Sequence, residues 1–265
     1  MFGMSGSSWW ADVVDWLVLA LVGLSGLAFP DGAGAWYGAF GACFLAIAGP
    51  VLAGAGLVTW LATRVGRPIQ WPRRGSALIP ASARDTARAA FVAAGFAAWP
   101  LALLRAQRPT GLEWSLARAG GLGSVVVQTL LALLVIDAWL YWKHRLLHTR
   151  FLFPFHRDHH VYRDPTPFAG FAVGPVESVL TFWPILLLCI PAATHWAPLY
   201  FGLIGSFVAL NFYLHSGVTL RWVEATLPRL YINTSAFHNL HHAHADRNFG
   251  EAFTIWDRLL RTGRV

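Results

Sequence analysis

The sequence predicts an all-α integral membrane protein with about six hydrophobic helices, four clear spans plus a helical hairpin, and a cytoplasmic histidine-rich helical cap. Three observations predict this fold class. Hydrophobic residues make up 56% of the 265-residue chain and charged residues only 12%. Apolar runs long enough to cross a hydrocarbon core of ~30 Å recur along the chain. None of the eleven histidines precedes His144, and most of them are clustered.

The low charge content excludes an ordinary soluble domain, in which charged residues typically make up about 25%. The net charge of +7 comes almost wholly from arginine, because Lys143 is the only lysine. In a membrane chain this balance reports topology and contact with anionic headgroups, and no basic groove motif points to nucleic acid. Cys43 and Cys189 lie inside apolar runs, so we expect neither a disulfide nor a cysteine metal site. Because Met1–Trp10 has no basic region, we expect no cleaved signal peptide.

Four apolar runs predict membrane-spanning helices, and a fifth apolar stretch predicts a hairpin. The four runs are Ala11–Phe29, Trp36–Thr63, Thr86–Leu104 and Leu122–Trp142. The fifth stretch, Val176–Leu214, is broken near Pro191 and Pro198, which leaves open whether both of its arms cross the membrane. Tryptophans near the ends of the runs are typical of interfacial anchors. They are Trp9, Trp10, Trp36, Trp60, Trp71, Trp142 and Trp196.

The arginine distribution predicts the orientation of these helices. Six arginines follow the second run, whereas the connection after the first run offers only Asp31. The third connection carries three arginines, a smaller cluster that opposes the assignment. We therefore place the Arg64–Arg88 loop in the cytoplasm. Alternation puts the N-terminus, Lys143–Gly170 and the region from His215 on the same side. The chain has no internal repeat, so we expect one domain, a membrane bundle with a polar cap.

Eight of the histidines form three short clusters. These are His144-x3-His148, His156-x2-His159-His160 and His238-x2-His241-His242. Positions i, i+3 and i+4 share one face of a helix, so we expect each cluster to present its imidazoles in one direction. Three clusters with this spacing on one side of a membrane predict a metal centre rather than scattered core histidines.

The ligand chemistry narrows the choice of metal. Imidazole suits Zn, Cu, Fe and Ni, and the thiolates that favour iron–sulfur clusters are missing. Eight or nine imidazoles exceed what one ion can coordinate, which indicates two ions. A carboxylate-bridged di-iron site would use Glu-x-x-His pairs, and a zinc protease would use His-Glu-x-x-His. The chain has neither motif. A nearly all-imidazole shell best fits a membrane-bound non-haem di-iron site.

The sequence resembles the fatty acid hydroxylase and sterol desaturase superfamily of membrane-bound, histidine-rich di-iron oxygenases. The matching motifs are Asp137-Ala-Trp-Leu-Tyr-Trp-Lys-His-Arg-Leu-Leu-His148, Phe155-His-Arg-Asp-His-His160, Asn211-Phe-Tyr-Leu-His-Ser-Gly217, Phe237-His-Asn-Leu-His-His242, Asn248-Phe-Gly250 and Trp256-Asp-Arg-Leu259. They are in the family's order. The resemblance implies nine metal ligands: His144, His148, His156, His159, His160, His215, His238, His241 and His242. It also implies two iron ions, for which zinc can substitute in purified protein.

One position departs from the family pattern. The family often has a histidine before proline in the segment matched by Gly174-Pro-Val-Glu177, and here glycine stands there. This weakens the case for a ligand or substrate role at residue 174 and leaves the predicted metal core unchanged. Within a single domain over residues 1–265, we expect N-terminal membrane spans at 1–136 and a histidine-box catalytic region at 137–262.

The remaining histidines receive separate interpretations. The ligand role of His215 rests mostly on the family match. His244 follows the third cluster by two residues, and we favour a solvated or supporting residue over a ligand. His195 lies in the predicted hairpin turn, on the opposite face, and is expected to be structural.

Other polar residues are expected to support the site. Asp137 and Tyr141 share a helical stripe with His144 and His148. A carboxylate in an apolar span is costly unless paired, so we expect Asp137 to orient a ligand imidazole, with an ion pair to arginine or Lys143 as the alternative. We place Tyr141 and Asn248 in the same supporting role. The segment Trp256-Asp257-Arg258 is expected to close the C-terminal region by packing and ion pairing.

These expectations converge on an O2-dependent lipid hydroxylase or desaturase in a membrane, with hydroxylation favoured. A di-iron site of this kind uses O2 and two electrons to attack an unactivated C–H bond. The sequence has no His-Pro-Gly-Gly haem-binding segment, so we expect a separate electron-donor protein. The arginine-rich composition suggests a bacterial inner membrane. The alternatives are a non-enzymatic metal-binding or metal-transport protein, which would need ligands near the bilayer midplane, and a bis-histidine haem carrier.

Overall fold

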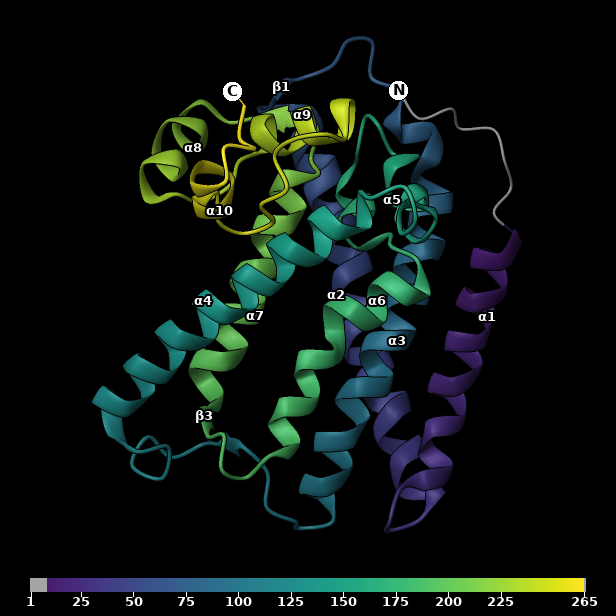
Figure 1. Ribbon diagram of the computed structural model, residues 1–265, viewed down its shortest axis with the longest axis vertical. Coiled ribbons are helices and arrows are strands. Elements are labelled where there is room, and N and C mark those ends of the chain that lie inside the picture. Colours follow the sequence, from purple (N-terminus) through teal and green to yellow (C-terminus); the bar gives the residue numbers. More distant parts are fainter. Residues whose placement is uncertain (1–8, 265) are drawn as a thin grey trace.

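The computed structural model describes residues 9–264, and in it long helices, of which α4 runs diagonally to the others, lie beneath a cap of short helices (Figure 1). Five helical segments are long and apolar enough to cross a membrane. They are α1 (Trp9–Leu24, extended by a 3₁₀ turn to Ala28), α2 (Ala33–Val65), α3 (Ile79–Arg105, preceded by a 3₁₀ turn), α4 (Gly121–Leu147) and α7 (Ala197–Leu214). The prediction of an all-α membrane protein is confirmed. The interpretation of Met1–Trp10 as an uncleaved start falls largely outside the described residues.

The predicted hairpin is present, with unequal arms. Its first arm is the short helix α6 (Pro175–Phe182) continued by a 3₁₀ segment to Cys189, and its second arm is α7. The helices also run past the predicted limits at the functional end. Helix α3 begins at Ile79 instead of Thr86, because Pro80 in its first turn has the fixed φ that suits a helix start. Helix α4 continues beyond Trp142 and carries His144 out of the apolar run.

Small residues let α2 and α3 pack closely. On α2, Ala48, Ala55 and Ala62 are buried at seven-residue spacing, and they face a helix rich in buried alanine. Small side chains allow helix backbones to approach closely where lipid supplies no hydrophobic driving force. Leucines on the outer face of α4, such as Leu130 and Leu134, remain exposed, as expected of a lipid-facing surface.

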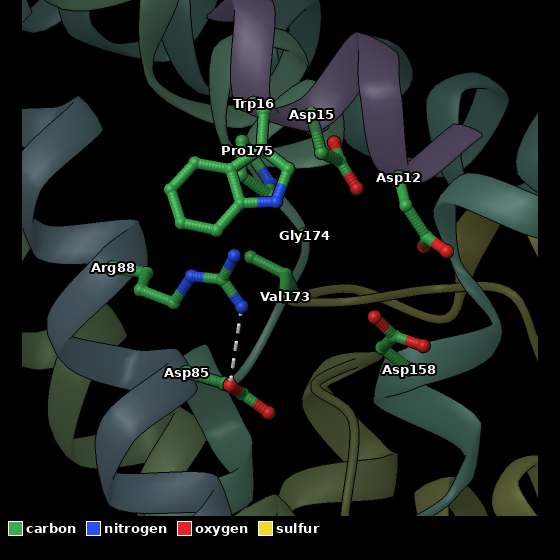
Figure 2. A pocket seen from close by; sticks show the side chains of 9 residues that line it. All are labelled: Asp12, Asp15, Trp16, Asp85, Arg88, Asp158, Val173, Gly174 and Pro175. Carbon is green, nitrogen blue, oxygen red and sulfur yellow. Dashed lines mark ion pairs between the residues drawn. The ribbon is translucent and has the colours of Figure 1, made fainter. Parts of the chain in front are cut away.

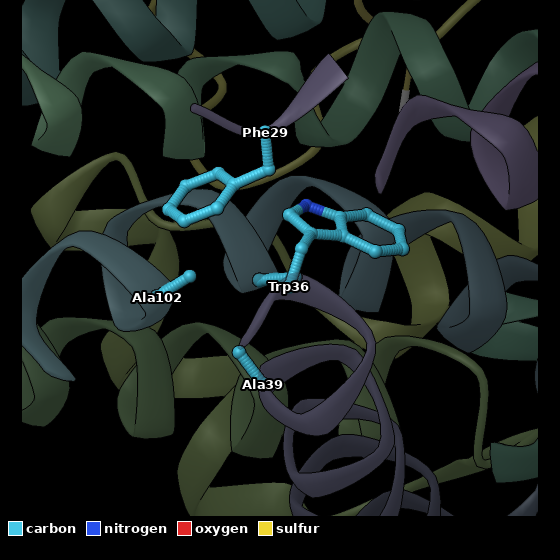
Figure 3. Packing of buried hydrophobic residues seen from close by; sticks show 5 residues of the cluster. Phe29, Trp36, Ala39 and Ala102 are labelled. Carbon is cyan, nitrogen blue, oxygen red and sulfur yellow. The ribbon is translucent and has the colours of Figure 1, made fainter. Parts of the chain in front are cut away.

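Trp36 is not the interfacial anchor that its position near a span end predicts. Its side chain is fully buried and stacks on Phe40, with ring centroids 5.2 Å apart. Figure 3 shows the indole packed among Phe29, Ala39 and Ala102. Gly26 leaves the space that the ring fills, because a Cβ atom there would overlap it. Trp36 therefore belongs to the helix core.

Short strand pairs join the connections at each end of the bundle. At the capped end, β1 (Arg67–Pro68) pairs antiparallel with β4 (Val218–Thr219). At the other end, β2 (Leu112–Glu113) pairs in parallel with β3 (His195–Trp196). The cap consists of α5 (Arg157–His160), α8 (Arg221–Thr226), α9 (Ser235–His244) and α10 (Ile255–Leu259).

The structure agrees with the relative sidedness that was predicted from alternation of the spans. Arg157 in α5 pairs with Asp12 at the start of α1, at 2.7 Å. Arg73, in the loop after α2, donates to the carbonyls of Pro165 and Gly217. The start of α1, the arginine-rich loop, the segment after α4 and the C-terminal region therefore lie together, and His195 lies at the opposite end (Figure 1).

Candidate metal centre

The nine histidines predicted as ligands gather into two neighbouring groups. The five-histidine group consists of His144, His148, His156, His160 and His241, and the four-histidine group consists of His159, His215, His238 and His242. Within each group the ligand nitrogens lie within 4.8 Å of one another. All nine side chains are buried except that of His148, which is partly buried. The structure thus brings every predicted ligand to one place.

Helical spacing explains how the clusters are divided. Residues four apart share a helix face, and accordingly the pairs His144/His148, His156/His160 and His238/His242 each stay within one group. Adjacent residues on a helix point about 100° apart, because a turn takes 3.6 residues. His159 and His241 therefore point to the other group from their neighbours. The expectation that each cluster faces one direction is wrong for the second and third clusters.

Backbone and carboxylate oxygens hold four of the imidazoles by their Nδ1 atoms. In the five-histidine group, His144 donates to the Phe249 carbonyl at 2.9 Å, and His241 donates to the Arg247 carbonyl at 2.7 Å. The His156 Nδ1 lies 2.7 Å from Glu177 Oε2.

In the four-histidine group, His215 donates to the Asn211 carbonyl at 3.0 Å. Carbonyl oxygens only accept hydrogen bonds, so the Nδ1 atoms that face them carry the proton. The Nε2 atoms of those rings are then left with lone pairs, which is the tautomer that binds a metal.

The Nε2 atoms converge without enough protons to bond one another. His160 Nε2 lies 3.1 Å from the Nε2 atoms of both His148 and His156, and 3.2 Å from that of His241. One N–H can serve only one of these contacts. In the four-histidine group, the Nε2 atoms of His238 and His215 lie 3.0 Å apart.

Several buried ring nitrogens have no partner among the described residues, including His144 Nε2 and both nitrogens of His242. Buried polar atoms are normally hydrogen-bonded, so converging lone pairs of this kind need a cation between them. Each group therefore fits a metal ion that prefers imidazole, such as iron or zinc.

Burial keeps these imidazoles in the neutral form that metals bind. It lowers the pKa of His215 and of His241 to about 4. Burial, followed by the neighbouring imidazoles, holds the pKa of His159, His160 and His242 well below its ordinary value. Neutral rings at neutral pH are ready to bind a metal without first losing a proton.

Three charged residues at the site were not predicted. The Lys143 ammonium lies 2.8 Å from Glu251 Oε1 and 3.6 Å from Glu177 Oε1, and Glu177 reaches His156 with its other oxygen. The Lys143 and Glu177 side chains are each only 3% exposed. Thr181 accepts a hydrogen bond from Lys143 at 3.0 Å. Charges at the ends of apolar runs were the available signal, because burying them is costly without a partner.

Asp137 and Tyr141 do not touch a ligand imidazole. The Asp137 carboxylate accepts a hydrogen bond from the Phe253 amide at 3.2 Å, so the predicted contact with an imidazole is wrong. The Tyr141 hydroxyl bonds the Thr262 hydroxyl at 2.9 Å, and its ring packs on Phe249. Both residues hold the C-terminal segment against α4, and that segment supplies the carbonyl that His144 contacts.

Asn248 and Asp257 support the site from the C-terminal segment. The Asn248 side chain donates to the carbonyls of Phe237 and Arg264, which ties α9 to the chain end without contacting a histidine ring. Asp257 accepts hydrogen bonds from the amides of Phe249 and Gly250, at 3.0 and 2.7 Å. The closing role predicted for Trp256-Asp257-Arg258 is thus carried by hydrogen bonds of Asp257 rather than by an ion pair within the described residues.

His244 and His195 lie outside both groups. His244 is exposed at the end of α9, so the favoured interpretation as a solvated residue agrees with its position. His195 lies in β3, beside Tyr200 at the far end of the bundle. Neither residue is placed to share a metal ion with the clusters.

A narrow cavity of ≈ 40 Å³ adjoins both histidine groups. Histidines from both groups line one side, together with Lys143 and the two glutamates. The opposite side is apolar and comes largely from Phe171, Phe182 and Phe207. The cavity therefore connects the ring nitrogens with the apolar space between α6 and α7, and its volume holds about one water-sized molecule.

A larger hollow of ≈ 320 Å³ lies on the other side of Val173. Figure 2 shows its acidic lining, with Asp15, Asp158 and the Asp85–Arg88 pair around the opening. Gly174 forms part of its wall, and a Cβ atom there would lie 3.2 Å from the Phe155 carbonyl and 3.3 Å from the Asp15 carboxylate. Residue 174 thus borders the acidic hollow and lies outside both histidine groups.

Comparison with known proteins identifies the family. A family model described as fatty acid hydroxylase matches residues 129–262, about half of the chain. Human lathosterol oxidase is 33% identical over 148 residues, covering 52% of this chain and 46% of that protein. Lathosterol oxidase from Mus musculus is 34% identical over 144 residues (51% and 44%), and the Delta(7)-sterol 5(6)-desaturase ERG3A of Gibberella zeae is 32% identical over 144 residues (51% and 37%).

The chain spans less than half the length of these curated relatives. No solved structure matches it. The match runs from within α4 to beyond the end of α10 and contains all nine histidines of the two groups. On this evidence the chain belongs to the fatty acid hydroxylase family.

Proposed function

We propose that the protein is a membrane di-iron oxygenase that hydroxylates or desaturates an aliphatic C–H bond of a lipid, using O2 and two external electrons. The observation that carries the proposal is the pair of buried histidine groups, whose Nε2 atoms converge with too few protons to satisfy every contact among them. Two iron ions would supply the oxidising chemistry when bound, one in each group. Zinc fits the same imidazole shell and is expected as a substitute in purified protein.

The residues of the chain position and shield this centre. The carbonyls of Phe249 and Arg247 and the carboxylate of Glu177 fix the ring orientations of three ligands. The phenylalanines of the cavity keep water from the ring nitrogens on the side that faces the bilayer. A lipid chain needs more room than the cavity offers, so Phe182 and Phe207 must move apart when a substrate approaches between α6 and α7.

The relatives support a lipid substrate, and the family description names a hydroxylase of fatty acids. The names of the relatives describe an oxidase of lathosterol and desaturases of Delta(7)-sterols. An aliphatic C–H bond is the group that sterols share with fatty acyl chains. We favour hydroxylation or desaturation of such a bond, with electrons delivered by a separate donor protein.

We also propose an arrangement in the membrane. The histidine end of the bundle faces the cytoplasm, because the six arginines between Arg64 and Arg88 favour that side, and the host membrane is a bacterial inner membrane. Residues 137–262 carry the catalytic region and residues 1–136 supply membrane spans. Reporter fusions after Arg74 and Lys143 should report the cytoplasm, and a fusion near His195 should report the opposite side.

The experiment starts with protein purified anaerobically in detergent and loaded with iron(II). Metal analysis should give two iron ions per chain. The reduced protein is then mixed with isotopically labelled O2 and membrane lipids, and the lipids are examined by mass spectrometry. Hydroxylation places labelled oxygen in a lipid, whereas desaturation removes two hydrogen atoms and leaves the label in water.

Two variants control this experiment. His241→Ala removes a buried ligand and should abolish the product, whereas His195→Ala, at the far end, should leave it unchanged. A protein that binds two ions but transforms no lipid with any electron donor would favour a non-enzymatic metal-binding role. Fewer than two ions after anaerobic loading would overturn the di-iron assignment itself.

A further inference from the structure

A buried cluster of three charges forms direct hydrogen bonds and ion pairs with only one of the two histidine groups among the described residues. Glu177 lies on α6 and reaches His156 Nδ1 at 2.7 Å, while its other oxygen faces the Lys143 ammonium at 3.6 Å. Lys143 itself contacts Glu251 at 2.8 Å. In the described part of the chain, Glu177 is the one carboxylate within hydrogen-bond distance of a predicted ligand, since Glu251 lies 4.0 Å from His144 Nδ1.

The four-histidine group has no comparable support among the described residues. Its one held ring is that of His215, and the acceptor there is a neutral backbone carbonyl. The Nδ1 atoms of His159 and His238 have no hydrogen-bond partner, and neither ring nitrogen of His242 has one. The imidazole ligands of the two groups therefore differ in the hydrogen bonds that hold their Nδ1 atoms.

The charge of the cluster favours a cation in the five-histidine group. Two carboxylates face a single ammonium in this buried region beside His144 and His156, so the ammonium does not balance both carboxylates when they are ionised. A buried charge without compensation is costly, and a metal ion bound by the adjacent imidazoles compensates it. A carboxylate that accepts from the Nδ1–H of a ligand also fixes the ring and strengthens its Nε2 as a donor.

We infer that Glu177, held by Lys143, is a positioning residue that makes the two metal positions unequal. The five-histidine group binds its ion more tightly, and the four-histidine group fills second and empties first. The inference rests on the proposed two-metal centre. The inference adds the order in which the two positions bind their metal ions. A two-metal centre does not by itself require such an order.

Cobalt(II) chloride is a suitable probe, because the colour of its complexes reports the ligands that surround it. The metal-free full-length protein in detergent is titrated with cobalt(II) in competition with a chelator of known affinity. The wild-type protein should bind two ions in separate steps. Glu177→Gln keeps the shape but removes the charge, so the tighter step should weaken by ~10–100-fold, with a changed absorption spectrum for the first ion. The weaker step should stay within about twofold.

Glu224→Gln is the matched control. Glu224 lies at the same end of the molecule and accepts a hydrogen bond from the Tyr213 hydroxyl at 2.6 Å, without contacting a ligand histidine. Both cobalt(II)-binding steps of the Glu224→Gln variant should match those of the wild-type protein. Size-exclusion chromatography of the metal-free variants checks that each is folded. If Glu177→Gln does not fold, Glu177→Asp keeps the charge but shortens the reach to His156, and it should weaken the tighter step alone.

The outcomes separate this inference from the proposed function. Two wild-type ions with a tighter step unchanged in the Glu177 variants, or with both steps weakened equally, would overturn the inference and leave the two-metal centre intact. Binding of fewer than two ions by the wild-type protein would overturn both. Selective weakening of the tighter step in a folded variant supports the role of Glu177.

Discussion

The five-histidine group and the four-histidine group share one kind of ligand but differ in what holds it. In the first group, three of the rings are held through Nδ1 by oxygen atoms, those of His144, His156 and His241. In the second, His215 alone is held in this way among the described residues. Ligand orientation is therefore better fixed in the five-histidine group, where a charged cluster adds to it.

The difference extends to the elements that carry the ligands. The five-histidine group depends on the end of α4 and on the C-terminal segment, which Asp257 ties down through the amides of Phe249 and Gly250. The four-histidine group depends on the end of the apolar helix α7 and packs beside Gly170. The comparison teaches that ligands of a single residue type can form a centre in which one metal position is held more firmly than the other.

The largest effect is expected from replacing adjacent ligands of the two groups. His241→Ala removes a ligand from the five-histidine group, and His242→Ala removes one from the four-histidine group. Each variant should lose turnover and most of one metal ion, because each loses a donor that faces the ion. Metal analysis and lipid turnover measure both effects. His244→Ala, an exposed position on the same helix, should match wild type.

The division into two metal-binding groups would be wrong if these two variants lost the same ion. Cobalt(II) spectra of the remaining ion should differ between His241→Ala and His242→Ala, because a different group stays intact in each. Identical spectra would mean that the nine histidines form one shared site rather than two.

Gly170→Ala is expected to have a smaller effect on metal binding, restricted to the four-histidine group. The new Cβ atom would overlap the Asn211 side-chain oxygen and lie 3.3 Å from His215 Nδ1. Overpacking of this kind typically costs about 1–3 kcal/mol of stability, and here it should lower occupancy of the weaker metal position. The tighter position should keep its affinity, as measured by cobalt(II) titration.

Gly202→Ala controls for the added methyl group. Gly202 lies on α7, and a Cβ atom there would meet nothing within 4 Å. Its metal binding should equal that of wild type. Equal loss at both metal positions in Gly170→Ala would show that the two groups are mechanically coupled rather than independent.

Local patterns predicted the helices and the gathering of the clustered histidines well, because both depend on neighbours in the chain. Apolar runs of sufficient length predicted the spans, and spacings of three and four residues predicted the histidines that gather at the centre. Helical spacing separates His159 and His241 from their cluster neighbours, but it does not determine which clusters combine into one group, because that depends on how α5 and α9 face each other. Trp36 illustrates the same limit, since its burial depends on Gly26 across a helical hairpin.

The supporting residues were harder to predict for a geometric reason. Asp137 and His144 share a helical stripe but are seven residues apart, about 10 Å along the helix axis, which is too far for a carboxylate to reach an imidazole. Glu177 was within reach only because α6 folds beside α4 and brings it to His156 and Lys143. The partner of a buried charge is set by tertiary packing, so the sequence offered Lys143 as a possible partner of Asp137 but did not show that Lys143 pairs with Glu251 and Glu177.

The smallest effect is expected for Asp137→Asn, compared with Glu177→Gln. Both changes replace a carboxylate by an amide of nearly the same shape. The Asp137 carboxylate accepts from the Phe253 amide at 3.2 Å, and the side-chain oxygen of asparagine can accept the same bond. We therefore expect metal affinity within about threefold of wild type and little change in turnover per bound iron, well short of the ~10–100-fold loss typical of a residue that orients a ligand.

Asp137→Leu separates the hydrogen bond from the charge. It leaves the Phe253 amide without its acceptor, at a cost of about 1–3 kcal/mol for an unsatisfied buried group. Thermal unfolding should show that loss, whereas cobalt(II) titration should still show two steps. If Asp137→Asn instead weakened metal binding as strongly as Glu177→Gln, contact with an imidazole would no longer distinguish the two carboxylates. The five-histidine group would then depend on the charge of both, and the C-terminal segment would transmit the effect of Asp137 to His144 through the Phe249 carbonyl.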